Sequence, residues 1–404
     1  MRKPRGEVIG MSSEDEMAAR RGHGSVPDSG SGRVQRPDYE GRAGEVAGIA
    51  VTNGLLGLVT LGFYRFWGKT RLRRYLWGRV GFDGDAFEYS GAGMELFVGF
   101  LVAIAILIPL GILGSVVEFA FPADQTVLAV SGIVQGLAIV FLVQFAIYRA
   151  RRYRLTRTQW RGIRAGQTGS AVSYAFILLW WFVAVGLTLG LAYPVMRAGM
   201  QRYRTENTWF GTEQFSFVGG AGPLFGRWLL AWLLLIPTLG LSYAWYRAGE
   251  FRYFAASTRY AGLTFGSELS TGRVIWIWLR YMLVLVAIMV AAGAIASFIM
   301  PGFLYGLKTL GGGDQEAIVV VMESLGSTFL LLLFAMMFAV GIAVGVARLA
   351  LFVHPMLGEI CRTLTIAGEA DFDAILQSQQ VRRRAARVSP TSSMSALSDS
   401  GHAA

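Results

Sequence analysis

The stretch that decides the fold is LLGLVTLGFYRFWGKTRLRRYLWGRVGFDGDAFEYSGAGMELFVGF, residues 55–100. An apolar run ends at Leu61-Gly62, a basic and aromatic segment follows, and a second apolar run begins near residue 94. A helix needs about 20 apolar residues to cross the roughly 30 Å hydrocarbon core of a bilayer. The stretch therefore predicts membrane helices joined by a basic segment at the membrane surface.

The composition extends this prediction to most of the chain. Of 404 residues, 54% are hydrophobic and 16% are charged, whereas soluble domains carry about 25% charged residues. We predict an all-α polytopic membrane protein with six or seven transmembrane helices, internal repeats and short interfacial segments that are strand-like or loops. The predicted apolar segments are 46–65, 94–121, 127–148, 171–195, 224–246, 273–300 and 327–353.

Basic residues give the orientation, because short loops rich in Arg and Lys stay in the cytoplasm. The loops after the first and third segments are strongly basic, whereas the connections at 122–126 and 301–326 are not. This asymmetry predicts a cytoplasmic C-terminus. Seven crossings would put the N-terminal tail outside. The alternative is that residues 46–65, which contain Thr52 and Asn53, dip into the membrane without crossing it.

The two ends of the chain differ in composition from its centre. Residues 1–45 mix Gly, Ser, Arg and Glu without apolar periodicity and predict a disordered tail. Residues 376–404 are basic and then rich in Ser, and predict a second disordered tail. Between them, residues 46–375 form the expected multi-pass membrane domain. The net charge of +11 favours anionic lipid headgroups as partners over nucleic acid, because the basic residues adjoin apolar segments.

Three related units recur at about 46–90, 171–218 and 219–270. Each has Leu-Gly at the end of an apolar run, a base eight positions after the Leu, Arg-Tyr after thirteen and Phe after twenty-six. The spacing has no gaps, and it indicates duplication. The members are Leu61, Leu189 and Leu239; Lys69, Arg197 and Arg247; Arg74, Arg202 and Arg252; Phe87, Phe215 and Phe265. The second and third copies are adjacent, so a single membrane crossing in each would place their similar basic linkers on opposite faces of the membrane. Either the repeat is therefore inverted or one segment is re-entrant.

The bases and aromatics of these units are candidates for contact with lipid headgroups. Tryptophan and arginine gather where a helix leaves the hydrocarbon. We expect Arg73 and the arginines of the Arg-Tyr pairs to face lipid phosphate at headgroup depth. The full set of candidates is Lys69, Arg73, Arg74, Arg197, Arg202, Arg247, Arg252, Trp67 and Trp245. Ordinary anchoring at the membrane surface explains the same pattern without a binding site.

Residues 55–100, together with PTLGLSYAWYRAGEFRYF at 237–254, resemble the YjgN-like bacterial inner membrane proteins, a family defined by a domain of unknown function. The resemblance covers about residues 45 to 375. The second unit departs from it, because Tyr193-Pro194-Val195 stands where the others carry tryptophan. The resemblance implies an inner-membrane location, and it carries over no catalytic residue.

Little in the chain indicates catalysis, a cofactor or a metal. Cys361 is the single cysteine, and His354 is the one histidine outside the tails, so neither a thiolate zinc site nor a paired-histidine site can form. Asp83-Gly84-Asp85 lacks the ligand spacing of a calcium loop. Two proline-glycine pairs, Pro109 with Gly111 and Pro237 with Gly240, are candidates for broken helices that build a transport site.

Three hypotheses follow from these observations. The first is a protein, not an enzyme, that moves or contacts small or lipidic molecules. The second is a structural or assembly protein that organises lipids or partner proteins, with a homo-oligomer or a membrane-protein partner possible. The third is an intramembrane enzyme that uses His354 with a nearby Ser or Glu.

Overall fold

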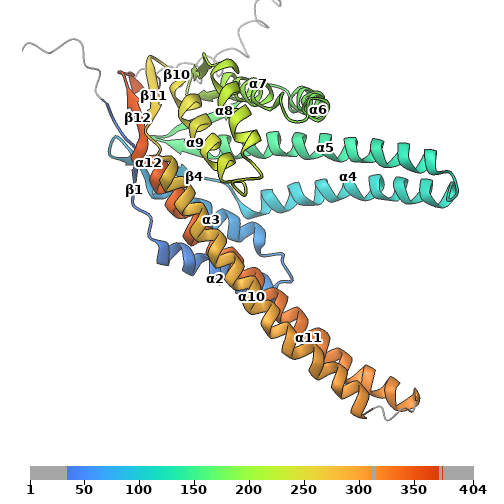
Figure 1. Ribbon diagram of the computed structural model, residues 1–404. Helices are drawn as coiled ribbons and strands as arrows, with labels where there is room; N and C mark the ends of the chain where they lie inside the picture. Colours follow the sequence, from blue (N-terminus) through green and yellow to red (C-terminus); the bar gives the residue numbers. More distant parts are fainter. Residues whose placement is uncertain (1–33, 311–314, 373–374, 376–404) are drawn as a thin grey trace, which may run out of the picture.

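The computed structural model describes residues 34–310, 315–372 and 375 (Figure 1). Residues 1–33 and the predicted C-terminal tail at 376–404 lie outside the described residues. The rest of the predicted N-terminal tail is ordered. Residues 34–45 hold strand β1 (Asp38–Tyr39) and the start of helix α2, so the predicted tail was too long. Local composition missed this strand because its partner β2 follows about 40 residues later.

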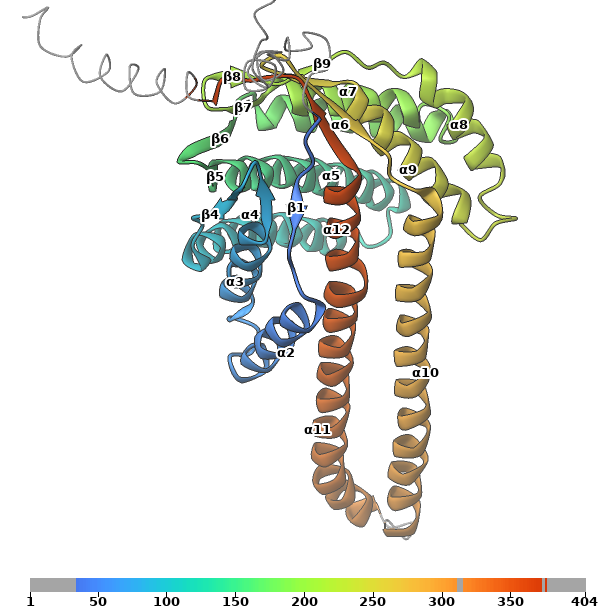
Figure 2. The same cartoon turned by 90° about the vertical axis from the view of Figure 1, so that its left-hand side faces the viewer.

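Two long helical hairpins project from one end of the molecule, where the strands gather (Figures 1 and 2). The first joins α4 (Gly93–Ala120) to α5 (Gln125–Thr156), and the second joins α10 (Thr271–Leu310) to α11 (Gln315–Ala347). Helix α11 continues through the π-helix η1 (Arg348–Val353) into α12 (His354–Thr363). Four stretches in them are long and apolar enough to cross a membrane: Gly93–Ala120, Gln125–Thr156, Thr271–Phe298 and Ser327–Thr363. The protein covers none of their most apolar windows, so their surface suits lipid.

The other predicted segments form short helical hairpins. In each, an apolar helix turns back into a more polar second helix that lies against it. The pairs are α2 (Ala43–Val59) with α3 (Arg65–Gly78), α6 (Ala171–Leu187) with α7 (Tyr193–Glu206), and α8 (Gly222–Leu233) with α9 (Leu241–Ala256). The segments expected at 46–65, 171–195 and 224–246 therefore do not run through as single helices.

The turn in each short hairpin is the Leu-Gly pair of the predicted units. Leu61, Leu189 and Leu239 have φ of 50°, 50° and 48°, and the following glycines have φ of 89°, 91° and 85°. Each glycine N–H donates to the carbonyl five residues earlier, at 2.6, 2.7 and 2.8 Å, which closes a Schellman motif. A left-handed Leu is strained, and the preceding threonine supports it.

That threonine joins the two helices of each hairpin. Its hydroxyl donates to a carbonyl of the first helix and accepts from the first turn of the second. Thr238, for example, donates to the Leu234 carbonyl at 2.6 Å and accepts from the Ser242 N–H at 3.1 Å. A Thr-Leu-Gly sequence after an apolar run therefore reverses the chain here.

Short strands flank every helical hairpin and pair with each other. β1 pairs with β2, β4 with β5, β6 with β7, β9 with β10, and β11 with β12, all antiparallel. Tight turns link consecutive hairpins through β2–β3, β5–β6, β7–β8 and β10–β11. The strands after β1 are β2 (Val80–Phe82), β3 (Asp85–Ala86), β4 (Glu88–Tyr89), β5 (Thr158–Trp160), β6 (Ile163–Gln167), β7 (Thr208–Phe210), β8 (Glu213–Gln214), β9 (Ser216–Phe217), β10 (Thr258–Tyr260), β11 (Leu263–Ser267) and β12 (Leu364–Ala367).

A backbone bridge between Gln35 and Ile366 joins the last strand to the segment that leads into β1, with N–H to O distances of 2.8 and 2.9 Å. The strands form three hydrogen-bonded sheets, β1-β2-β3, β4-β5-β6-β7-β8 and β12-β11-β10-β9. The short chain links from β3 to β4 and from β8 to β9, together with the bridge, connect these sheets into a circuit. The helices form a parallel circuit. Each contacts the next in chain order from α2 to α11, and α11 contacts α2.

An aromatic core fills the strand end of the molecule. Phe82, Trp160, Tyr260 and Ile366 are buried there, and Phe210 packs against them. The four aromatic residues each stand just before the tight turn that ends their strand, and Ile366 is the last residue but one of β12. The Trp160 ring lies 5.6 Å from that of Phe82 and 6.2 Å from that of Phe210. Residues about 50 to 100 positions apart therefore meet in one cluster.

Gly240→Ala tests the left-handed turn. Gly240 has φ of 85° and open space around the position of a Cβ. We therefore expect the substitution to lower the free energy of unfolding by about 1 kcal/mol, through backbone strain and not through a steric clash. Gly226→Ala is the control, because Gly226 lies inside α8, also in open space, without a positive φ. We expect thermal unfolding in detergent at a lower temperature for Gly240→Ala and at an unchanged or higher one for Gly226→Ala. Equal midpoints would contradict the account.

Candidate functional site

One face of each second helix carries residues at equivalent positions of the three units, four residues apart. Positions four residues apart lie on one side of a helix, and on this side, the inner face, the three short hairpins have equivalent residues. They are Arg65, Lys69 and Arg73 on α3; Tyr193, Arg197 and Gln201 on α7; Tyr243, Arg247 and Phe251 on α9. The hydroxyls of Tyr193 and Tyr243 lie 3.2 Å apart, so the inner faces of α7 and α9 adjoin.

Between α7 and α9 the charges are balanced by a buried carboxylate. Glu250 is 2% exposed. Arg197 donates to both of its oxygens, from Nε at 2.8 Å and from Nη2 at 3.0 Å, and Arg247 also pairs with it. Such a bidentate contact is among the stronger hydrogen-bonded pairs. Burial, and then the charge of Glu250, raises the pKa of Tyr246 beside it, so that phenol stays neutral.

On α3 the same face has no such carboxylate. Arg65 and Lys69 are exposed, and Arg73 donates to the Tyr89 hydroxyl at 3.0 Å. Arg348, at the start of η1, lies close enough to act on Lys69. Partial burial, followed by Arg65, Arg73 and Arg348, lowers the pKa of Lys69. No acidic partner pairs with any of these four cations among residues 34–310, 315–372 and 375.

This row of like charges opposes folding of the isolated helix. Like charges four residues apart destabilise a helix by roughly 0.2–0.5 kcal/mol per pair. The guanidinium of Arg65 lies 5.6 Å from the ring of Phe66 and 5.9 Å from that of Phe100, which favours the cation but supplies no counter-charge. The α3 face therefore carries positive charge that no carboxylate of the described residues balances.

Two further arginines lie where α5 meets α7: Arg151 on α5 and Arg204 on α7. Arg151 donates to the Arg204 carbonyl at 3.2 Å and to the Thr208 hydroxyl at 3.3 Å. Arg204 bonds the Met200 carbonyl at 3.2 Å, and burial lowers its pKa, with Arg197 and Arg247 acting in the same direction. Our sequence analysis did not select Arg65, Arg151, Arg204 or Arg348. A four-residue spacing from Lys69 would have identified Arg65.

The arginines of the predicted Arg-Tyr pairs join each short hairpin to the start of the next hairpin, and the tyrosines hold each short hairpin closed. Arg74 and Arg202 donate to carbonyls seventeen residues later, at Gly91 (3.0 Å) and Gly219 (2.8 Å), and Arg252 does the same at Leu269. The tyrosines reach back thirty-three residues: Tyr75, Tyr203 and Tyr253 accept from the N–H groups of Arg42, Ser170 and Gly220 at 2.9, 3.1 and 2.8 Å. These contacts explain the fixed spacing structurally. Contact of these arginines with lipid phosphate stays a prediction.

The two candidate tryptophans have different surroundings. Trp67 is 40% exposed and lies beside Phe97 of α4, with 6.2 Å between the rings. Trp245 packs against the buried cluster that contains Phe217 and Trp228. Trp67 therefore suits the membrane surface better than Trp245 does.

The two proline-glycine candidates also differ. Helix α4 continues through Pro109 and Gly111 to Ala120, so this pair does not break the helix. Pro237 and Gly240 lie in the turn between α8 and α9, where the helix does break. That break reverses the chain and does not interrupt a spanning helix.

His354 is engaged with a tyrosine. Its Nδ1 lies 2.8 Å from the Tyr39 hydroxyl, and neither Ser nor Glu takes that place. In the part of the chain that the structure describes, no group of three or more His, Cys, Asp or Glu side chains is arranged to hold a metal ion.

Glu250→Gln tests the pairing of α7 with α9. The change leaves Arg197 partly buried without its carboxylate, and we expect a loss of about 2 kcal/mol, below the usual figure for a buried pair because both arginines are partly exposed. Glu268→Gln is the control, because Glu268 pairs with Arg36 at the surface and such pairs contribute under about 1 kcal/mol. The readout is the unfolding midpoint in detergent. Similar losses for both variants would refute a special role for Glu250.

Three curated relatives share part of this architecture by sequence. The chain is 25% identical over 145 residues to the inner membrane protein YjgN of Salmonella typhimurium, which covers 36% of this chain and 33% of that protein. It is 27% identical over 149 residues to the proteins of the same name in Escherichia coli O157:H7 and K12, covering 35% of this chain and 33% of each. The matched region thus spans about a third of the relatives' length. No solved structure matches the chain.

The family described as bacterial protein of unknown function (DUF898) matches residues 35–241. This range holds all of α2 to α7, the helix α8 and the closed turn at Gly240. With its apolar helices and its similarity to proteins named as inner membrane proteins, the chain is a membrane protein that belongs to the YjgN-like DUF898 family.

Proposed function

We propose that this protein, rather than being an enzyme, moves or contacts lipidic anions held against the inner face of its short helical hairpins. The single observation that carries the proposal is the row of Arg65, Lys69 and Arg73 on α3, which has no carboxylate partner among the described residues, on a hairpin that turns back at Leu61-Gly62. A transporter of soluble ions is less well supported, because the first helices of these hairpins are apolar and lead the basic face into hydrocarbon.

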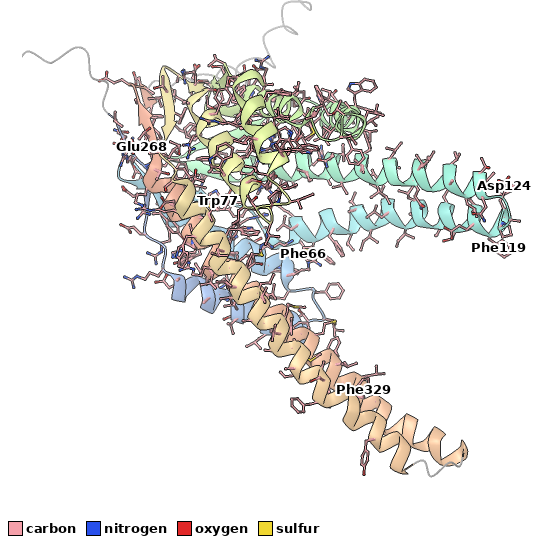
Figure 3. All side chains as sticks on the ribbon, in the orientation of Figure 1. Phe66, Trp77, Phe119, Asp124, Glu268 and Phe329 are labelled. Atoms are coloured by element: carbon pink, nitrogen blue, oxygen red, sulfur yellow. The ribbon has the colours of Figure 1, made fainter. Side chains whose placement is uncertain are left out.

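The proposed topology has four crossings, with both ends of the described chain in the cytoplasm. All strands lie at one end of the molecule, and Asp124 lies at the far tip of the α4–α5 hairpin from Glu268 (Figure 3). Basic residues gather in the helix ends and turns next to the strands, as at Arg154, Arg157 and Arg161, which favours the cytoplasmic side. Since Gln35 pairs with Ile366, the two tails leave from the same end. This removes the need to export the N-terminal tail.

The short hairpins are proposed to be re-entrant. Their first helices have 17, 17 and 12 residues, so they are about 25, 25 and 18 Å long, less than the roughly 30 Å of hydrocarbon. Their tips expose Leu61, Leu189 and Leu239 by 80, 77 and 88%. Exposed leucines at a turn suit hydrocarbon better than water. Re-entry also places the basic linkers on the same side of the membrane.

The internal repeat is proposed to extend beyond three units. The α4–α5 hairpin and the α10–α12 segment carry the same flanking strand pairs and contribute Trp160 and Ile366 to the shared core. Tyr153 of α5 bonds the Ala92 carbonyl at the start of α4, as the tyrosines of the short hairpins do. Duplication of a strand–helix–helix–strand unit accounts for both sizes of hairpin, with all units in the same orientation.

The alternative function is a structural or assembly role, in which the protein organises lipids or partner membrane proteins. The observation that favours it is the bare apolar surface of the two long hairpins, which diverge from the strand end (Figure 1). A second copy or another membrane protein would cover such helices by close packing. A stoichiometric partner on purification would support this role.

Single cysteines in a Cys361→Ser background test the topology. We expect a membrane-impermeant thiol reagent to label Asp124→Cys in intact cells. Asp83→Cys and Arg161→Cys, in the turns beside the strands, should react only after the cells are opened. Leu189→Cys, at a hairpin tip, should react from neither side. Labelling of position 189 in intact cells would show that this segment crosses the membrane.

Reconstitution tests movement itself. Vesicles that contain the purified protein and a fluorescent phosphatidylglycerol should show faster transfer of the probe between leaflets than empty vesicles, because a basic inner face stabilises the anionic headgroup inside the protein. The same assay with Arg71→Gln, a change on another face of α3, controls for charge. Transfer no faster than in empty vesicles, for anionic and zwitterionic probes alike, would reject movement and leave the structural role.

A further inference from the structure

We propose that Arg65, Lys69 and Arg73 of α3, with Arg348 of η1, form a stepwise binding path for the phosphate group of anionic phospholipids. This set is called the basic ladder below. The inference rests on the proposed function only in placing the α2–α3 hairpin in the bilayer. It specifies the ligand, the chemical group recognised and the residues that bind it.

The ladder runs along the length of the hairpin. Arg65 stands one turn after the Leu61-Gly62 tip, and Lys69 and Arg73 follow at four-residue steps toward the strands. At 1.5 Å per residue, the three Cα positions span about 12 Å along α3. Arg74, one residue further, is tied to the Gly91 carbonyl beside the strands. The row therefore leads from the strand end toward the hydrocarbon.

The equivalent row on α7 and α9 shows what the ladder lacks. There Arg197 and Arg247, which correspond to Lys69, share the carboxylate of Glu250. On α3 the residue that corresponds to Glu250 is Leu72. Within the described residues no carboxylate replaces it. An anion from outside the chain would supply the same two-sided contact that Glu250 makes.

The helix that carries Arg348 has an unusual geometry at this point. Residues Arg348–Val353 are π-helical, and Pro355 follows in α12. Proline has no N–H for the Leu351 carbonyl four residues earlier, and Arg280 of α10 donates to that carbonyl instead at 3.4 Å. π-helical turns are frequent at functional sites. Here the turn begins at Arg348, and η1 packs against α2, the helix that lies against α3.

Helix α2 adds a polar atom next to the ladder. Asn53 donates from Nδ2 to the Gly68 carbonyl at 3.1 Å, directly before Lys69. Its Oδ1 is buried and has no hydrogen-bond partner among the described residues. A phosphate ester offers only acceptors, so it would bind the cations rather than this oxygen.

A lipid source fits this site better than free phosphate. Phe66 and Phe100 lie beside Arg65, and Val98 and Leu101 of the adjoining helix α4 are exposed. Cations next to apolar surface suit a ligand with a charged head and acyl chains. Inorganic phosphate would lose most of its hydration there and gain no apolar contact.

The experiment compares two triple variants of the full chain in a zwitterionic detergent. The ladder variant is Arg65→Gln, Lys69→Gln and Arg73→Gln. The matched control is Arg71→Gln, Arg149→Gln and Arg152→Gln, which removes the same charge from exposed arginines elsewhere. The probes are dioleoylphosphatidylglycerol, dioleoylphosphatidylcholine and inorganic phosphate. The readouts are bound lipid per protein by native mass spectrometry and the shift in melting temperature.

We expect phosphatidylglycerol to bind and stabilise the wild type and the control, and its dissociation constant to rise about tenfold or more in the ladder variant. Without lipid, the ladder variant should melt no lower than the wild type, because repulsion along α3 is removed. If the ladder variant fails to fold, Lys69→Gln and Arg348→Gln are measured as single variants. We expect each to lose less phosphatidylglycerol binding than the triple variant, and we expect Lys69→Arg to retain binding.

Equal phosphatidylglycerol binding by the ladder variant and the wild type would overturn the proposal. A melting shift with inorganic phosphate as large as that with phosphatidylglycerol would overturn its lipid source. Failure of the proposed lipid movement can be distinguished from failure of the binding site. If the ladder binds phosphatidylglycerol but the protein does not transfer lipid between leaflets, only the movement is rejected.

Discussion

Backbone pairing between the two strands that flank each helical hairpin determines how the rest of this protein is arranged. Isolated pairs of two to five residues are weak, but here each strand also turns into the next hairpin, and the bridge from Gln35 to Ile366 closes the circuit. The closure brings one large residue from the end of each of five strands into a single core around Trp160. The helices leave this base at fixed places, so their faces are fixed as well.

The arginines of the chain divide into three physical roles. Arg74, Arg202 and Arg252 donate to backbone carbonyls just before the next hairpin and so join consecutive hairpins. Arg197 and Arg247 neutralise the buried Glu250 and join two hairpins. The cations of the basic ladder have no such partner in the described chain. Basic residues at equivalent positions of the repeated units therefore have different roles: some hold the structure together, and those of the ladder have no carboxylate partner among the described residues.

The Leu-Gly turn connects these roles. It reverses the chain inside the apolar segment, so the second helix returns toward the strands, and in α7 and α9 this brings Tyr193 beside Tyr243. If each apolar helix continued straight, the bases of α3, α7 and α9 would enter the bilayer, where each charged side chain costs several kcal/mol of free energy. Reversal keeps every base within reach of the strand end or of a headgroup. A strained left-handed leucine is retained at each tip.

The sequence by itself determined the class of protein, the apolar segments that include the four long helices, the position of the three Leu-Gly pairs and the constant spacing to Arg-Tyr. These are local signals, because hydropathy over twenty residues and gap-free spacing require no knowledge of what packs against what. Only the tertiary structure decided that three apolar segments reverse, that Asp38–Tyr39 is a strand, and that Lys69 lacks the carboxylate that Arg197 has. Hydropathy is the same for a helix that crosses and for one that turns back. The partners that decide between them, from Gln35 with Ile366 to Arg197 with Glu250, lie about 50 to 330 residues apart in the chain.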